Sequence, residues 1–195
     1  MGYLKRDWET LLAAYSSLRL QTNLKLVGGT GKVDLPESAQ AQKIECLPYV
    51  PINQLKEIIA RASLVALPLP YQLYSFGQMT LLQAMAMGKA VIVSNVPGIA
   101  DYVQDGKNAI LVRPYDYLEM RDKMEYWLTH PQERKTIGME ARKSIEEKFN
   151  EKNMAEGIFG SCMELLGYQS EKKTTVSCPG VVKIQSSKSE VDCDN

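Results

Sequence analysis

The sequence predicts an α/β protein in which a Rossmann-like parallel sheet of about five strands carries helices on both faces. Short apolar runs alternate along the chain with segments whose apolar residues recur at helical spacing. The linkers between them are short, which favours parallel strands joined by helical crossovers. The run Leu64–Pro70 is apolar at nearly every position, as expected for a parallel strand that is buried on both sides.

Each expected strand is short and ends near a glycine, a proline or a polar residue. The five runs are Leu24–Gly29, Lys43–Val50, Leu64–Pro70, Ala90–Ser94 and Ala109–Pro114. Helices are expected at Arg6–Leu18, Asn53–Ser63, the segment after Gly77, Tyr117–Thr129, Pro131–Phe149 and Glu151–Tyr168. Asp7 and Asn53 are candidate N-caps because their side chains can accept from first-turn N–H groups. Pro131 suits the first turn of its helix.

Composition narrows the class of protein. Lysine plus arginine and aspartate plus glutamate each number 23, so no basic field points to nucleic acid. No apolar run approaches the roughly 18 residues of a membrane span. With no signal-peptide core near the start, we expect a cytoplasmic protein. Residues 1–169 are expected to form one domain. The polar segment 170–195 is expected to be a disordered tail.

The four cysteines and the single histidine lack the spacing of metal ligands, so no metal site is expected. Cys46 lies in an apolar strand pattern and is expected to be buried. A Cys178–Cys193 bridge is left open, but reduced thiols are the simpler expectation. His130 precedes Pro131 and is interpreted as a residue at the start of a helix rather than as a base.

The stretch "SFGQMTLLQAMAMGKAVIVSN", from Ser75 to Asn95, is the most informative. A glycine precedes an apolar helix, and a strand follows directly. A helix N-terminus has unpaired N–H groups and the positive end of the helix dipole, and it can therefore bind an anion. Taken alone, a glycine at this place more often marks only a turn.

Several segments, in this order, resemble one family. They are "RDWETLLAAY", "LKLVGG", "VPINQLKEIIARASLVALPLP", "FGQMTLLQAMAMGKAVIVSNVPGIADYVQDGKNAILVRPYD" and "RKTIGMEARKSIEEKFN". Together they are similar to the C-terminal, donor-binding domain of GT-B glycosyltransferases of family 4, also described as glycosyl transferases group 1. The resemblance covers about Gly2 to Tyr168. It implies one half of a GT-B fold, with a nucleotide diphosphate-sugar as donor substrate and no further cofactor.

The resemblance also implies a set of site residues. Backbone amides of Phe76, Gly77, Gln78 and Met79 would hold the diphosphate, and Thr80 would add a hydroxyl. Arg6 would stabilise charge on the leaving phosphate, with Lys5 as an alternative. Gly28 and Gly29 end a strand where a ligand could approach, or they form only a tight turn. The loop Leu47–Val50, with Tyr49, would face the nucleotide base.

The sequence departs from the family at two places. The family carries a glutamate before the glycine-bearing loop and another on the helix. Here Ser75 (Tyr74 in the other alignment) and Gln83 stand there, so hydrogen bonds to hydroxyls remain but the negative charge does not. The family's strand before Gly2 and its N-terminal acceptor domain also have no counterpart in this sequence.

Two functions therefore stay open. In the first, the chain is the donor half of a retaining hexosyltransferase in glycan biosynthesis and needs an acceptor domain from a separate chain or from a longer protein. In the second, it binds a nucleotide or a partner protein without catalysis, alone or as a homodimer. A truncated product with no role of its own is a third possibility.

Overall fold

The computed structural model describes residues 6–28, 44–74 and 76–167. The predicted tail 170–195 lies outside these ranges. The chain divides into two compact units, Met1–Met154 and Ala155–Asn195. The first contains the layered fold. Helix α7 (Glu151–Leu165) spans the division and has no buried residue. Among the described helices, none is both long and apolar enough to cross a membrane.

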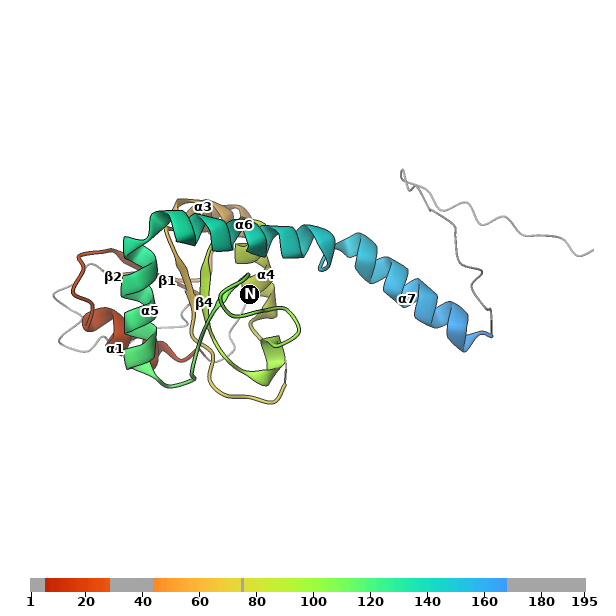
Figure 1. Ribbon diagram of the computed structural model, residues 1–195, viewed down its shortest axis with the longest axis horizontal. Coiled ribbons are helices and arrows are strands. Elements are labelled where there is room, and N and C mark those ends of the chain that lie inside the picture. Colours follow the sequence, from red (N-terminus) through yellow and green to blue (C-terminus); the bar gives the residue numbers. More distant parts are fainter. Residues whose placement is uncertain (1–5, 29–43, 75, 168–195) are drawn as a thin grey trace, which may run out of the picture. The chain divides into compact units, whose positions relative to one another are not determined.

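The described strands are parallel and follow the predicted order (Figure 1). Strand β1 (Leu24–Val27) pairs with β2 (Ile44–Leu47), with Leu24 opposite Ile44. Strands β3 (Val65–Leu67), β4 (Val91–Ser94) and β5 (Ile110–Val112) form a second sheet in the order β3-β4-β5. The α/β prediction is confirmed, but hydrogen bonding distributes the five described strands over two sheets rather than one.

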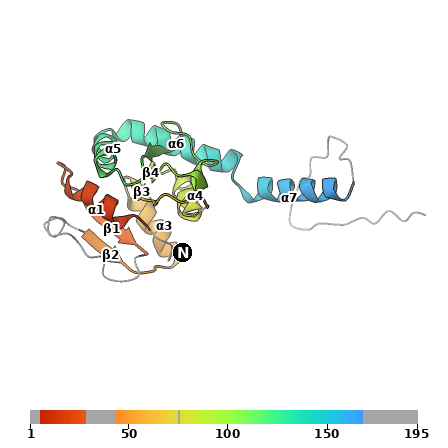
Figure 2. The ribbon, with the colours of Figure 1, turned by 90° about the horizontal axis from the view of Figure 1, so that it is seen from below.

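Strand β4 shows why both faces of the three-stranded sheet must be covered. Its four residues are all buried, and the three apolar ones alternate between two hydrophobic clusters. Ile92 packs in the cluster that contains α1 (Trp8–Ser16) and α5 (Tyr117–Thr129). Val91 and Val93 pack in the cluster that contains α4 (Gln78–Ala86) and Ala141 of α6 (Pro131–Glu147). Figures 1 and 2 show α5 and α4 on opposite sides of β4.

Side-chain chemistry fixes several helix ends. Asp7 is the N-cap of α1, and its Oδ1 accepts from the Thr10 N–H at 3.1 Å. Asp116 caps α5 in the same way at 2.9 Å. Pro131 occupies the first turn of α6, as predicted. The Lys89 ammonium donates to two carbonyls at the end of α3 (Ile52–Arg61), where a cation also complements the helix dipole.

Two local predictions are wrong. Asn53 is not an N-cap, because α3 begins one residue earlier and Pro51 takes the cap position without a side-chain hydrogen bond. Cys46 is exposed rather than buried. In the described structure β2 pairs with β1 alone, so part of the surface of β2 stays exposed to solvent. The suggested Cys178–Cys193 bridge lies outside the described residues.

Candidate functional site

The predicted anion site lies where the chain passes from β3 to α4. Gly77 is the N-cap of α4 and has φ +82°, a left-handed conformation that glycine adopts without strain. The first intrahelical bond runs from the Leu81 N–H to the Gly77 carbonyl at 3.1 Å. The preceding N–H groups of Gln78, Met79 and Thr80 therefore have no partner within the helix. Gly77 supplies no side-chain cap, which leaves those amides open to a ligand.

Tertiary structure brings Arg6 to this helix start. Its Nη2 lies 3.5 Å from the Thr80 hydroxyl, although the two residues are 74 positions apart. A Cβ added to Gly77 would lie 3.5 Å from Arg6 Nη1. Arg6 is held there because the N–H of the next residue, Asp7, donates to the Pro68 carbonyl just after β3, at 3.2 Å. We call Arg6, Gly77 and the first turn of α4 the cradle.

The charge of Arg6 is incompletely compensated. Its Nη1 is buried and has no hydrogen-bond partner in the part of the chain that the structure describes. Burial lowers the pKa of Arg6, and no carboxylate acts to raise it again. An arginine stays cationic at neutral pH all the same. A buried cation beside the positive end of a helix dipole is destabilised, and a bound anion would relieve this.

The other predicted residues lie on or next to α4, on the other sheet, or outside the described residues. Phe76 is buried in the core and offers only its backbone, whereas the Met79 side chain is 60% exposed. Gln83 is half-buried and lies one turn beyond Thr80 on the same face of α4. Gly28 (φ +89°) and the exposed Tyr49 lie at the ends of β1 and β2, on the other sheet. Ser75 and Gly29 lie outside the described residues.

Two residues at this edge were missed by the sequence analysis. The buried Ser94 hydroxyl accepts from the Leu69 N–H at 2.9 Å, and the Tyr115 hydroxyl accepts from the Tyr71 N–H at 3.0 Å. Ser94 was visible as a polar residue at the end of an otherwise apolar strand. Tyr115 gave no such signal, because its conformation and partner depend on the fold.

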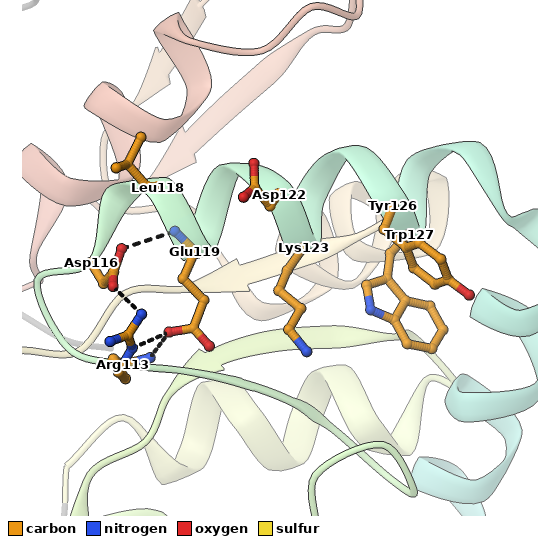
Figure 3. Close-up of a pocket in the computed structure, with 8 residues that line it drawn as sticks. All are labelled: Arg113, Asp116, Leu118, Glu119, Asp122, Lys123, Tyr126 and Trp127. Atoms are coloured by element: carbon orange, nitrogen blue, oxygen red, sulfur yellow. Dashed lines mark hydrogen bonds and ion pairs between the residues drawn. The ribbon is translucent and has the colours of Figure 1, made fainter.

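A shallow depression of 620 Å³ lies elsewhere, along α5 and the end of β5 (Figure 3). Three carboxylates and two cations line it, and the Arg113 guanidinium is 2.7 Å from an Asp116 oxygen and 2.8 Å from a Glu119 oxygen. Hydrogen bonding to Glu119 and the nearby carboxylates raise the pKa of Arg113. These paired charges leave less attraction for a ligand than the cradle offers. Within the described ranges, no group of three or more potential metal ligands occurs.

Comparison with known proteins decides the family. The sequence model of the family described as "Glycosyl transferases group 1" matches residues 1–130. The chain belongs to this family. A curated relative, an uncharacterized glycosyltransferase of Methanocaldococcus jannaschii, is 29% identical over 169 residues. The match covers 82% of this chain and 43% of that protein.

Solved structures of glycosyltransferases share the fold. Anabaena HepE in complex with UDP-glucose is similar with a TM-score of 0.70 and 18% identity, over 82% of this chain and 45% of that one. The C-terminal domain of LpcC from Francisella tularensis, a glycosyl transferase group 1 protein, gives 0.65 and 16%, over 75% and 80%. The chain spans less than half of the first two proteins but most of the isolated domain. The prediction of a C-terminal half of a GT-B fold is confirmed.

Proposed function

We propose that the cradle binds the diphosphate of a nucleotide diphosphate-sugar, and that the chain is the donor-binding part of a glycosyltransferase. One observation carries the proposal: Arg6 Nη1 is buried without a partner in the described structure, beside the open first turn of α4. Family membership supports the proposal. The presence of UDP-glucose in the HepE structure indicates the class of donor to test first.

In this proposal the protein acts mainly on the leaving group. The amides of Gly77, Gln78 and Met79 would donate to diphosphate oxygens, with Thr80 as a further donor. Arg6 would offset the negative charge that grows on the diphosphate as the sugar leaves. Hydrogen-bond donors that are already in position before the reaction stabilise this charge most, because they need not rearrange as the charge develops. No step of the proposed reaction uses a metal ion or a separate cofactor.

The sugar and ribose hydroxyls would be bound by neutral groups. Gln83 both donates and accepts hydrogen bonds, and its position on the face of Thr80 suits a ribose that follows the diphosphate. Ser75 and the strand-end residues Gly28, Gly29 and Tyr49 complete the proposed donor site. An amide in place of a carboxylate leaves the hydroxyls without a charged acceptor, and we therefore expect weaker donor binding than a glutamate would give.

Transfer would need an acceptor part that the described residues do not provide. We propose that another part of a longer protein, or a separate chain, supplies it. Helix α7 offers a surface for this part, since it exposes Met154, Ile158 and Leu165 at spacings of four and seven residues, which place them on one helical face. A homodimer through the same surface is the alternative.

A non-catalytic nucleotide-binding role is the second candidate, and the amide of Gln83 favours it. The two candidates differ in one outcome. A catalytic chain mixed with an acceptor part releases nucleoside diphosphate from the donor sugar at an accelerated rate. A binding module would bind the nucleotide with the same affinity and leave this rate unchanged.

Titration calorimetry with UDP, GDP and ADP tests the cradle. We expect one of them to bind, and Arg6→Ala to weaken it about ten- to hundredfold, as loss of a charged hydrogen bond does. Arg6→Lys should keep part of the affinity. Arg142→Ala, on the exposed side of α6, is the matched control and should bind as the parent does. No binding of any nucleotide, or an Arg6→Ala variant equal to the parent, would remove the proposal.

A further inference from the structure

Two side-chain hydroxyls anchor the segment that leads from β3 to the cradle. The Leu69 N–H donates to Ser94 Oγ at 2.9 Å, and the Tyr71 N–H donates to the Tyr115 hydroxyl at 3.0 Å. Ser94 is the last residue of β4, and Tyr115 follows the end of β5. Each of the other two strands of the sheet thus fixes one backbone amide of this segment, which we call the anchored segment (residues 68–71).

The anchored segment supports both halves of the cradle. Its Pro68 carbonyl accepts from the Asp7 N–H at 3.2 Å and so holds the chain next to Arg6. Its Leu69 side chain lies against Gly77, since a Cβ there would be 2.8 Å from Leu69 Cδ2. A shift of Leu69 would therefore move the arginine and the helix start relative to each other.

The Ser94 anchor is buried. Ser94 is 1% exposed, and in the described structure the Leu69 N–H forms no hydrogen bond other than the one to its hydroxyl. A buried amide without a partner destabilises its local conformation, and water cannot easily replace a hydroxyl at such a site. Loss of the Ser94 hydroxyl should therefore loosen the anchored segment.

The Tyr115 anchor is strained. Its φ is +65°, and it is the single non-glycine residue with a positive φ in the described structure. A bulky side chain in this conformation costs energy and persists where surrounding contacts hold it. Because the side chain is 59% exposed, burial in the core does not account for the conformation. The hydrogen bond to the Tyr71 N–H does account for where the hydroxyl lies.

We propose that Ser94 and Tyr115 are positioning residues of the cradle, which act by holding the anchored segment so that Arg6 and the α4 amides face one diphosphate. The inference rests on the proposed function and adds residues that need not touch the ligand. Ser94 has the larger effect, since its bond is buried while that of Tyr115 is exposed. A purely structural role would instead lower stability and leave the affinity of the folded protein alone.

The test compares a nucleoside diphosphate with its own nucleoside. UDP and uridine are titrated, or GDP with guanosine where GDP binds more tightly, and the ratio of the two association constants isolates the diphosphate contribution. We expect Ser94→Ala to lower this ratio about tenfold and Tyr115→Phe about two- to threefold, the range for loss of one hydrogen bond. Nucleoside affinity should not change. Ser94→Thr, which keeps a hydroxyl, should restore most of the ratio.

Two control variants remove a serine hydroxyl and a tyrosine hydroxyl at other positions. Ser144→Ala deletes a hydroxyl that accepts from Asn108, on the far part of α6, and Tyr117→Phe deletes an exposed phenol two residues from Tyr115. Both should keep the parental ratio. A parental ratio in Ser94→Ala and Tyr115→Phe would overturn the positioning role, as would an equal loss of UDP and uridine affinity.

The experiment distinguishes failure of the proposed function from failure of the positioning role. A parent protein that binds no nucleoside diphosphate refutes the proposed function and the positioning role with it. A parent that binds, together with variants that keep the ratio, refutes the positioning role alone. If Ser94→Ala does not fold, Tyr115→Phe decides the matter, because its side chain is exposed and its ring is retained.

Discussion

Gly138 is the position where one added methyl group should disturb the fold most directly. It lies buried in α6 and faces Gly88, just after the end of α4. A Cβ on Gly138 would lie 2.2 Å from the Gly88 carbonyl oxygen, 3.0 Å from its carbon and 3.3 Å from the Ala90 nitrogen. All three atoms belong to the backbone, so no side chain can rotate away from the contact.

The size of the effect follows from these distances. Carbon-to-oxygen contacts are usually no shorter than about 3.3 Å, so α6 must move by about 1 Å from the connection between α4 and β4. Overpacking costs about 1–3 kcal/mol, and a 2.2 Å contact with backbone that cannot rotate away belongs to the upper part of that range, about 2–3 kcal/mol. Alanine recovers about 1 kcal/mol of helix propensity relative to glycine. We therefore expect Gly138→Ala to lose about 1–2 kcal/mol of the free energy of unfolding.

Urea denaturation followed by tryptophan fluorescence measures this change, since Trp8 and Trp127 pack against the core. For a unit of this size the melting temperature should fall by about 5 °C. Gly157→Ala is the control: a Cβ at this α7 position meets no atom within 4 Å, so the variant should not be destabilised. A Gly138→Ala protein as stable as the parent would refute the claim that the backbones of α6 and Gly88 are in contact.

Three further substitutions test other parts of the fold. Lys89→Met should lower stability by about 1 kcal/mol, because the ammonium donates to the Ala60 carbonyl at 2.6 Å at the end of α3; urea denaturation measures it. Asn108→Ala should cost about 2 kcal/mol in the same assay, since this buried side chain satisfies backbone groups of its loop. For Tyr15, burial raises the pKa above its ordinary 10.0. The contribution of neutral Tyr15 to the free energy of unfolding is therefore complete below about pH 10 and is lost as the pH rises through the folded-state pKa. Tyr15→Phe should accordingly flatten the fall in the free energy of unfolding that is measured from about pH 9 to 11.

Each of these substitutions has its own control. Lys135→Met removes an exposed lysine of α6 and should be neutral; an equal loss for both lysines would mean that the carbonyl contacts contribute nothing. Asn23→Ala removes an exposed amide side chain and should be nearly neutral, unlike Asn108→Ala. If the Tyr15→Phe variant loses stability above pH 10 as steeply as the parent, ionisation of Tyr15 is not the cause.

Local patterns were predicted well where they depend on neighbouring residues alone. The continuous apolar run Leu64–Pro70 indicated a strand that is covered on both sides, and its residues pack in both hydrophobic clusters. Asp7 caps α1 because its side chain reaches an amide three residues away. Asn53 is not the cap because α3 begins at Ile52, which puts Pro51 at the cap position. Cys46 failed because the apolar pattern does not reveal how much of the β1-β2 sheet is covered.

By itself, the sequence determined the parallel α/β class, the order of the elements and the glycine that starts α4, since each follows from periodicity and backbone conformation over a few residues. It also indicated the family. Only the tertiary structure decided that Arg6 meets Thr80, that Ser94 and Tyr115 anchor the segment before the cradle, and that Gly138 touches Gly88. These contacts join residues dozens of positions apart, and their geometry depends on how the helices pack on the sheet rather than on any local pattern.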